Sequence, residues 1–561
     1  MLQSCYVILL NMQSIDDKIL LSVQKPARYS GGELNSIKKD LSRVNLKIAL
    51  SFPDQYEIGM SNIAIQILYY IMNKIEDVAC ERVFAPWPDM EDVLIKNNIP
   101  LFSLESRLPI SQFDMLGFCL AYELSYTNLL NILKLSHIPL RNAERDESHP
   151  LIFGGGPCAF NPEPLAPFID FFIIGEAEDA IVDVINKLKS KNVKFKKDKL
   201  EELSKIPGIY IPAIKQGKIK KRIVENLDSA DYPTKPIVPL LNVIHDRATL
   251  EIMRGCPAGC KFCQAGYTTK PVRERSPELL KKYAEEIISN TGYEEISLIS
   301  LSSSDYSHID ELSHDLLRKF KEKRVSIALP SLRSDSFSVK LARDIQEVRT
   351  SGVTLAPEAG TQRLRDYICK NLNEADILDA AKAAFEGGAH LIKLYFMIGL
   401  PTEKEEDLLG ICDLSRRILQ IGREFAPADR RKRIQIKASL STFVPKPHTP
   451  FEREAMITIP EIIEKHQFIK NNMRERGVDV KWHDAQMSVL EGVFALGDEK
   501  LAVVLEEALK LGCKFDGWTE HFHWDLWLKA FENCGIDYAN YIHRRKDADE
   551  ILPWSFIDAK G

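Results

Sequence analysis

The feature that most constrains the fold is an alternation of short apolar runs with amphipathic stretches, repeated along two long parts of the chain. In the first part, apolar runs such as 47–52, 150–153 and 170–174 are each followed by a glycine or by the start of a helical stretch. Strands that alternate with helices in this way form parallel sheets covered by helices. Residues 46–190 are therefore predicted to form a doubly wound parallel sheet of the α/β class.

The same alternation returns after residue 246 with longer helices. Six parallel strand-helix units are fewer than the eight of a complete barrel, so residues 246–480 are predicted to form a partial (β/α)6 barrel with one open flank. The apolar stretches expected as its strands are 249–253, 295–301, 325–329, 352–356, 391–398 and 434–440.

The remaining segments are expected to connect or extend these two domains. A chain of 561 residues is longer than one hydrophobic core supports. Residues 1–45 are expected as an N-terminal extension and residues 191–245 as a lysine-rich linker. Residues 481–561 are expected as a small helical C-terminal extension, rich in aromatic side chains that pack it onto the barrel.

Composition and charge exclude several classes of protein. Hydrophobic residues make up 45% and charged residues 27%, which are ordinary values for a globular protein. The net charge of −6 does not indicate a non-specific nucleic-acid binder. Two basic stretches, 189–221 and 430–433, are interpreted as solvated charge, with RNA contact as the alternative.

The ends and the cysteines indicate the compartment. The longest apolar stretch near the start, residues 6–10, is far shorter than the roughly 20 residues that cross a bilayer, so no signal peptide and no membrane partner are expected. The 11 cysteines are an odd number in a chain without a secretory signal. This favours a reducing compartment, the cytoplasm, over a disulfide framework.

Three of these cysteines, Cys256, Cys260 and Cys263, lie within eight residues directly after the first predicted barrel strand. Gly255 and Gly259 permit the tight loop that such spacing requires. Thiolates are the ligands that suit iron–sulfur clusters and zinc. A structural zinc site needs four ligands, and no second Cys-x₂-Cys or spaced histidine pair lies near. Three ligands would leave one metal position open to a substrate or cosubstrate.

The Cys-x₃-Cys-x₂-Cys spacing, with aromatic Phe262 before the third cysteine, resembles the radical S-adenosylmethionine (SAM) superfamily. The resemblance implies that Cys256, Cys260 and Cys263 hold a 4Fe–4S cluster whose open iron chelates SAM. Reductive cleavage of SAM would then yield a 5′-deoxyadenosyl radical. The carboxyl end of a barrel strand is also where barrel active sites lie.

The same resemblance implies contacts to SAM at the ends of later strands. The family binds the SAM amino group after the second strand, where this chain has serines instead of the usual Gly-Gly-Glu. Residues after the third and fourth strands offer a ribose acceptor and a cation for the carboxylate, and a glycine turn follows the fifth. Ordinary loop or helix-cap roles are the alternative for each. The residues implied to contact SAM are Phe262, Ser302, Ser303, Arg333, Glu358, Arg363, Gly399 and Glu403.

The first strand of the N-terminal sheet runs into a loop similar to the Asp-x-His-x-x-Gly loop of cobalamin-binding domains, with Tyr56 in place of the axial histidine. Cobalamin would therefore bind here without a histidine ligand. Glycines after two later strands match elements of cobalamin-binding radical SAM proteins, and the ordinary turns of a doubly wound sheet are the alternative. The positions implied for cobalamin are Tyr56, Gly59, Gly155, Gly156, Gly175 and Glu176.

From about residue 20 to 560 the chain resembles a family of radical SAM proteins with a cobalamin-binding-like N-terminal domain and an undefined substrate, related to methylthiotransferase and Elongator-type enzymes. Motifs that carry the resemblance include residues 25–29, 84–89 and 515–518. It implies an enzyme that methylates or similarly modifies an unactivated carbon, with cobalamin as methyl carrier. The alternatives are a cobalamin-independent enzyme acting on RNA or a ribosomal protein, and a non-catalytic iron–sulfur scaffold. The implied partners are a reductant such as flavodoxin or ferredoxin and a separate radical-SAM-linked protein.

Overall fold

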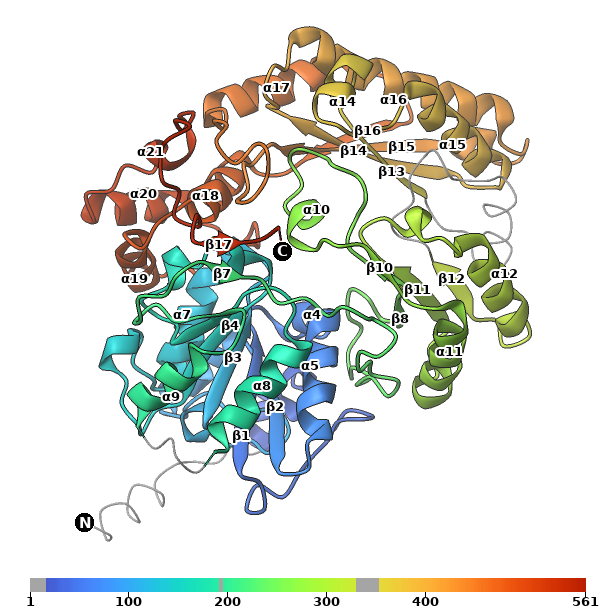
Figure 1. Cartoon of the computed structure of the whole chain (residues 1–561). Helices are drawn as coiled ribbons and strands as arrows, with labels where there is room; N and C mark the ends of the chain where they lie inside the picture. The colour runs from blue at the N-terminus through green and yellow to red at the C-terminus, as the bar shows by residue number, and fades with distance from the viewer. Residues whose placement is uncertain (1–16, 191–194, 329–352, 561) are drawn as a thin grey trace, which may run out of the picture.

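A computed structural model describes residues 17–190, 195–328 and 353–560. The N-terminal sheet lies at one end of the molecule, and the two sheets of the barrel lie opposite it (Figure 1). The C-terminal helices flank both parts (Figure 1). Two short helices, α2 (Asp17–Leu20) and α3 (Ala27–Ser30), precede the first strand.

The N-terminal sheet has the strand order β2-β1-β3-β4-β5-β6, and its first five strands are parallel. The strands are buried nearly throughout, as expected when helices cover both faces of a parallel sheet. The predicted doubly wound sheet is confirmed. Its elements are β1 (Leu46–Phe52), α5 (Ile63–Lys74), β2 (Val78–Phe84), α6 (Pro88–Lys96), β3 (Met115–Cys119), α7 (Tyr126–Leu135), β4 (Leu151–Gly155), β5 (Phe171–Ile173) and α8 (Glu178–Leu188).

Of the stretch 191–245, expected as a linker, residues 195–245 are described and contribute to the folded body. They contain helix α9 (Lys196–Leu203) and strand β6 (Ile209–Tyr210), which pairs antiparallel with β5. Strand β7 (Ile219–Lys220) pairs with β17 (Ile557–Asp558) near the end of the chain. Two-residue strands carry too little periodicity to be read from a sequence, which is why the stretch looked like a connector.

The barrel is split into two parallel sheets, β12-β11-β8 and β13-β14-β15-β16. The partial barrel is confirmed, and the described residues add a seventh parallel strand, β16, at the boundary predicted for the domain. Its elements are β8 (Ala248–Glu251), α11 (Pro277–Thr291), β11 (Glu295–Ile299), α12 (Ile309–Phe320), β12 (Ser326–Ala328), β13 (Val353–Glu358), α14 (Gln362–Tyr367), α15 (Glu374–Glu386), β14 (Leu391–Ile398), α16 (Glu405–Phe425), β15 (Gln435–Thr442), α17 (Ile459–Asn472) and β16 (Val478–Trp482).

The C-terminal extension packs against both domains. Helix α18 lies against α17 of the barrel and α19 against α7 of the N-terminal domain. Trp87 of the N-terminal domain is surrounded by Phe515, Trp518 and His521, with ring centroids 4.9, 5.6 and 4.8 Å away. The aromatic side chains of the extension were expected to pack onto the barrel, and Phe515 and Trp518 contact Trp87 of the N-terminal domain instead. The helices of the extension are α18 (Ala485–Ala495), α19 (Leu501–Leu511), α20 (Trp524–Asn533) and α21 (Ala539–Ile542).

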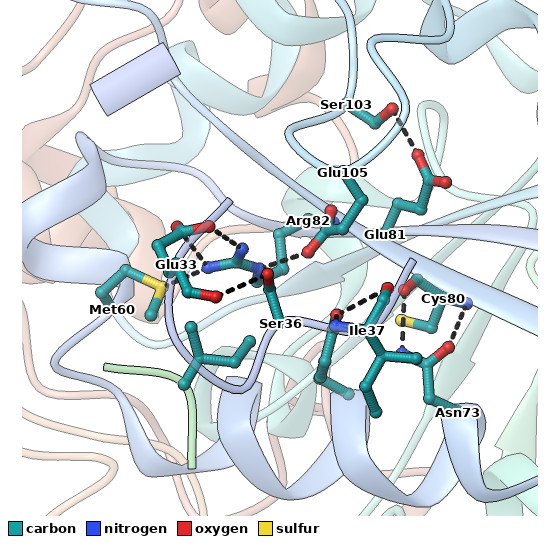
Figure 2. Close-up of polar contacts among 12 residues, drawn as sticks. Glu33, Ser36, Ile37, Met60, Asn73, Cys80, Glu81, Arg82, Ser103 and Glu105 are labelled. Carbon is teal, nitrogen blue, oxygen red and sulfur yellow. Dashed lines mark hydrogen bonds and ion pairs between the residues drawn. The ribbon is translucent and has the colours of Figure 1, made fainter. Parts of the chain in front are cut away.

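A buried ion network fastens the N-terminal extension to the sheet. Figure 2 shows Arg82 of β2 between two carboxylates: its Nη2 donates to Glu33 at 2.8 Å and its Nε to Glu105 at 2.7 Å. The side chain of Arg82 has no exposed surface, and those of both glutamates are 1% exposed. Burial alone would raise the pKa of Glu33, but Arg82 outweighs it and holds that pKa below its ordinary value.

Arg82→Ala should strongly destabilise the protein, because it leaves two carboxylates buried without their cation. We expect a loss of about 3–5 kcal/mol in the free energy of unfolding, measured by urea titration. Arg43→Ala is the control, since Arg43 pairs with Asp40 at 3.2 Å but the two side chains are 85% and 55% exposed. An exposed pair contributes at most about 1 kcal/mol. Equal unfolding midpoints for the two variants would contradict the importance of the buried network.

Candidate active site

The three clustered cysteines lie on a loop between β9 (Met253–Arg254) and α10 (Ala265–Thr268). Strand β9 follows the end of β8 and pairs antiparallel with β10 (Arg273–Glu274). This pairing closes the base of the segment that contains the loop and α10. Gly255 has φ +90°, and a Cβ there would lie 2.7 Å from the carbonyl oxygen of Pro271. The predicted position at the carboxyl end of the first barrel strand is confirmed. We call residues 255–264 the cysteine loop.

All three thiols of the cysteine loop are partly exposed. Burial raises the pKa of the Cys260 thiol to about 11 and also raises that of Cys263, while the nearby Lys370 opposes both shifts. Within the described residues, no group of three or more histidine, cysteine, aspartate or glutamate side chains is arranged around a single metal ion. Three soft thiol donors on one short loop fit a 4Fe–4S cluster with one open iron, which needs thiolates for only three of its irons.

The cysteine loop is also fastened to the second barrel sheet. The backbone N–H of Lys261 donates to the carbonyl of Ile368 at 3.0 Å. The Lys261 ammonium lies 4.7 Å from the centre of the Tyr367 ring. Phe262, implied to contact SAM, packs against the apolar cluster that contains Leu364 and Phe451. This aromatic residue therefore bridges the cysteine loop and the second sheet.

Lys370 and Glu358 form an ion pair at the cysteine loop, with Nζ and Oε1 3.2 Å apart. Both charges influence the pKa of Cys260 and Cys263. Glu358 ends β13 with φ +66°, and Cys369 beside Lys370 has φ +55°. Lys370 was not predicted from the sequence. The sequence offered one signal for Lys370, which is its position shortly after the helix that follows β13.

Two serines follow β11 where the SAM amino group was expected. The Ser303 hydroxyl donates to the carbonyl of Leu298 at 3.1 Å, so it has a structural role. The Ser302 hydroxyl is buried and has no hydrogen-bond partner among the described residues. Since a buried hydroxyl without a partner is costly, Ser302 is the one of the two that is available to a ligand.

The residues predicted after the fourth and fifth strands are engaged within the protein. Arg363 is paired with Asp407, and its Nη2 also donates to the carbonyl of Thr402 at 3.0 Å. Gly399 adopts φ +75°, and its N–H donates to both Glu403 oxygens at 3.0 Å. Glu403 also pairs with a lysine of α17. The predicted turn is present, while Arg333 lies outside the described residues.

Five of the positions implied for cobalamin are packed against the N-terminal domain itself. Tyr56 is 1% exposed, and its hydroxyl donates to Glu33 at 3.0 Å. A Cβ at Gly59 would lie 2.2 Å from the Phe84 ring. The other three are glycines that lie against neighbouring backbone or side chains of the same domain: Gly155, Gly156 and Gly175.

The sixth position, Glu176, binds the base of the cysteine loop. Its carboxylate lies 2.7 Å from Arg273 and 3.2 Å from Arg254. Arg254 also pairs with Glu178 at 2.8 Å and Glu251 at 2.9 Å. All five side chains are at most 14% exposed. We call these residues the arginine clamp; it connects the N-terminal domain to the residue that lies two positions before Cys256.

Residues 515–523, here called the C-terminal strap, cover the ends of β1 and β2. The indole N–H of Trp518 donates to Asp54 at 3.0 Å. Asp516 accepts from the Thr127 hydroxyl at 2.6 Å and from the Trp527 indole at 2.8 Å. Burial raises the pKa of Asp54 and of Asp516 to about 6. Motifs more than 400 residues apart in the sequence thus meet at this edge of the sheet.

Comparisons with known proteins agree with this geometry. A family model described as the radical SAM superfamily matches residues 250–415, which include the cysteine loop and the strands around it. A second, described as the N-terminal part of radical SAM proteins, matches residues 64–212.

The chain contains a radical SAM domain and the N-terminal domain of radical SAM proteins.

Three relatives of this radical SAM protein cover different shares of it. An uncharacterized protein of Methanocaldococcus jannaschii, MJ0966, is 28% identical over 87% of this chain and 97% of its own length. An uncharacterized methyltransferase of Pyrococcus horikoshii, PH0819, is 23% identical over 48% of this chain and 58% of its own. A tRNA-2-methylthio-N(6)-dimethylallyladenosine synthase of Clostridioides difficile is 29% identical over 31% of this chain and 37% of its own.

One solved structure shows the same fold as this radical SAM protein. It is the radical SAM methyltransferase TsrM of Kitasatospora setae, whose structure contains cobalamin and a 4Fe–4S cluster. The two chains align with a TM-score of 0.52 at 13% identity, over 73% of this chain and 77% of TsrM. The order of a parallel sheet, a barrel and a helical C-terminal region is therefore a shared architecture.

Alanine at Cys256, Cys260 or Cys263 should abolish cluster binding, because each removes one of only three thiolate ligands. The measurement is iron and sulfide content with visible absorbance after anaerobic reconstitution. Cys412→Ala is the matched control, since Cys412 is buried in the helical layer of the barrel. A full cluster in any of the three variants would show that the thiol concerned is not a ligand.

Removing the Asp516 carboxylate should flatten the dependence of stability on pH. Burial raises its pKa from 3.8 to about 6, so the folded state holds this proton more tightly than the unfolded state does. The free energy of unfolding therefore falls as the pH rises from about 4 to about 6. A pKa that differs by about 2 between the folded and unfolded states changes the free energy of unfolding by about 3 kcal/mol over this pH range. Urea unfolding of the cluster-free protein at pH 4 to 7 should show a smaller fall in Asp516→Asn. The exposed Asp549→Asn should follow the wild-type profile, and parallel profiles for all three proteins would refute the prediction.

Proposed function

We propose that the protein is a radical SAM enzyme that methylates, or modifies in a related way, an unactivated carbon of its substrate. The observation that carries this proposal is the cysteine loop, which brings three thiols to the carboxyl end of β8. A 4Fe–4S cluster bound there supplies the reductive cleavage of SAM to a 5′-deoxyadenosyl radical. The names of PH0819 and TsrM support methyl transfer as the class of reaction.

The chain's own residues would orient SAM beside the thiols. Lys370 brings an ammonium group to the cysteine loop, and such a cation binds a carboxylate through a charge-assisted hydrogen bond. Arg363, the cation expected from the sequence, is paired with Asp407 as Lys370 is with Glu358, but Lys370 is the cation that lies near the thiols of Cys260 and Cys263. Ser302 contributes the buried hydroxyl that lacks a partner, which suits the amino group. We therefore assign Lys370 and Ser302 to the methionine end of SAM.

A reaction without cobalamin is the second candidate, and the N-terminal domain favours it. The positions implied for cobalamin are packed within the domain or belong to the arginine clamp, and the C-terminal strap covers the ends of β1 and β2. The fold is nevertheless that of a protein whose structure contains cobalamin. Protein purified with the vitamin supplied separates the two candidates. Retained cobalamin absorbance supports cobalamin as methyl carrier, and no measurable affinity removes that role.

Partners and compartment belong to the same proposal. The reaction needs an electron donor, for which we propose a flavodoxin or ferredoxin, and a separate radical-SAM-linked protein as a further partner. The cysteines that are spread through the chain suit the reducing cytoplasm. Among the helices of residues 17–190, 195–328 and 353–560, none is long and apolar enough to span a bilayer.

The proposed chemistry predicts formation of 5′-deoxyadenosine. Reconstituted protein supplied anaerobically with SAM and dithionite should form it, and Cys260→Ala should not. Chromatography with mass detection measures the product. No 5′-deoxyadenosine above the Cys260→Ala control under several reductants would reject the enzymatic function in favour of a scaffold.

Lys370→Ala should weaken SAM binding by roughly 10- to 100-fold, the effect of losing one hydrogen bond between charged groups. Lys382→Ala is the matched control, because Lys382 lies over the Phe425 ring on the helical face of the barrel, with its Nζ 4.2 Å from the ring centre. Equilibrium dialysis of the reconstituted proteins with labelled SAM gives the two dissociation constants. Equal constants would show that Lys370 does not hold the SAM carboxylate.

A further inference from the structure

The second barrel sheet has one face covered by helices and one face without them. On β14, Ile392, Leu394 and Phe396 are fully buried and point to the side of α15 and α16. Lys393 and Tyr395, which alternate with them, are exposed. In Figure 1 the helices all lie on the outer side of this sheet, and its other side faces the interior of the molecule where α10 and the cysteine loop lie.

The register of the strands brings lysines from three neighbouring strands to this inner face. Lys393 of β14 lies beside Lys437 of β15, and Tyr395 lies in the row that contains Lys481 of β16. Paired residues of parallel strands point to the same side, and neighbouring strands are about 4.8 Å apart. We call Lys393, Tyr395, Lys437 and Lys481 the inner basic face.

In the described strands, the rows that hold the three lysines of the inner basic face contain a single carboxylate, that of Asp479. No ion pair or hydrogen bond joins its three lysines to any described residue; the carboxylate nearest to them in register is Asp479, beside Lys437. Lys370 at the cysteine loop, in contrast, has such a partner in Glu358. Like charges this close repel one another, and an anionic ligand would relieve the repulsion. The face stands out in a chain whose net charge is −6.

An exposed aromatic ring completes the face. Tyr395 is 44% exposed although it lies in the middle of a strand. It is four residues before Gly399, about 13 Å along the strand from the turn at the SAM-binding end. Lys393 lies one row further from that turn. A ligand that extends along β14 could therefore reach from the lysines to the carboxyl ends of the strands.

We propose that the inner basic face binds a single-stranded segment of nucleic acid, with the lysines on its phosphates and Tyr395 against a base. This inference rests on the proposed function and names the class of its substrate. Cations that follow a phosphate backbone, together with an aromatic ring on which a base stacks, are the combination that binds single strands. An acidic peptide would use the lysines but not the ring, so nucleic acid accounts for more of the face.

Fluorescence anisotropy with unstructured 12-nucleotide RNA and DNA probes tests the inference on the full chain. The triple variant Lys393→Ala, Lys437→Ala, Lys481→Ala should bind more weakly, and its plot of log affinity against log salt should be shallower by about 2 units, or about 0.7 per lost phosphate contact. Tyr395→Leu should weaken binding by about 5- to 150-fold without changing that slope. Comparing the affinities of the RNA and DNA probes shows whether the site prefers ribose or deoxyribose.

The control is Lys197→Ala, Lys199→Ala on α9, in the lysine-rich stretch that the sequence offered as an alternative RNA contact. It should bind the probes like the wild type. Wild-type affinity and slope in the triple variant would overturn the inference, and so would an acidic peptide that binds as tightly as the probes and depends equally on Tyr395.

Failure of this inference can be told apart from failure of the proposed function, since the binding measurement needs neither cluster nor SAM. Wild-type protein that binds the probes as expected but forms no 5′-deoxyadenosine would reject the proposed function alone. Wild-type protein that forms 5′-deoxyadenosine, with a triple variant that binds the probes as tightly, would reject the inner basic face alone.

Discussion

Arg254 connects the two halves of the molecule at the point where the chemistry is placed. Its guanidinium pairs with Glu176 and Glu178 of the N-terminal domain and with Glu251 at the end of β8. A guanidinium can satisfy several carboxylates at once because its donors form a rigid fork. Because Arg254 lies two residues before Cys256, the position of the first thiol depends on the packing of the N-terminal domain against the barrel.

The cysteine loop is held from its other side by the second barrel sheet. Lys261 bonds to the backbone at Ile368, and Phe262 packs in the same apolar cluster. These contacts also bring Lys370 to the thiols. The loop is thus fixed at its base by ion pairs and at its tip by backbone and ring contacts. The thiols and Lys370, which we propose to act on SAM, are therefore held by elements that are fastened to one another.

The sequence predicted much of the fold but only part of the site. The strand at 391–398 was predicted closely, because its alternation of residues is a local signal. Strands β7 and β17 were not predicted, since two residues show no period. Among the residues expected to contact SAM, Ser302 has a free hydroxyl, while Arg363 and Glu403 have partners in the protein. The motifs at 54–59 and 515–518 were noticed separately, and their contact through Asp54 and Trp518 could not be predicted.

By itself, the sequence determined the α/β class, the two-domain order and the triad of Cys256, Cys260 and Cys263. Each of these depends on short-range spacing, which a chain carries before it folds. The tertiary structure decided that Lys370 lies beside the thiols and that Glu176 binds Arg254. It also decided that lysines from three strands share one open face. Ion pairs and sheet register join residues far apart in the chain, so they are set by how the elements pack and leave no local pattern.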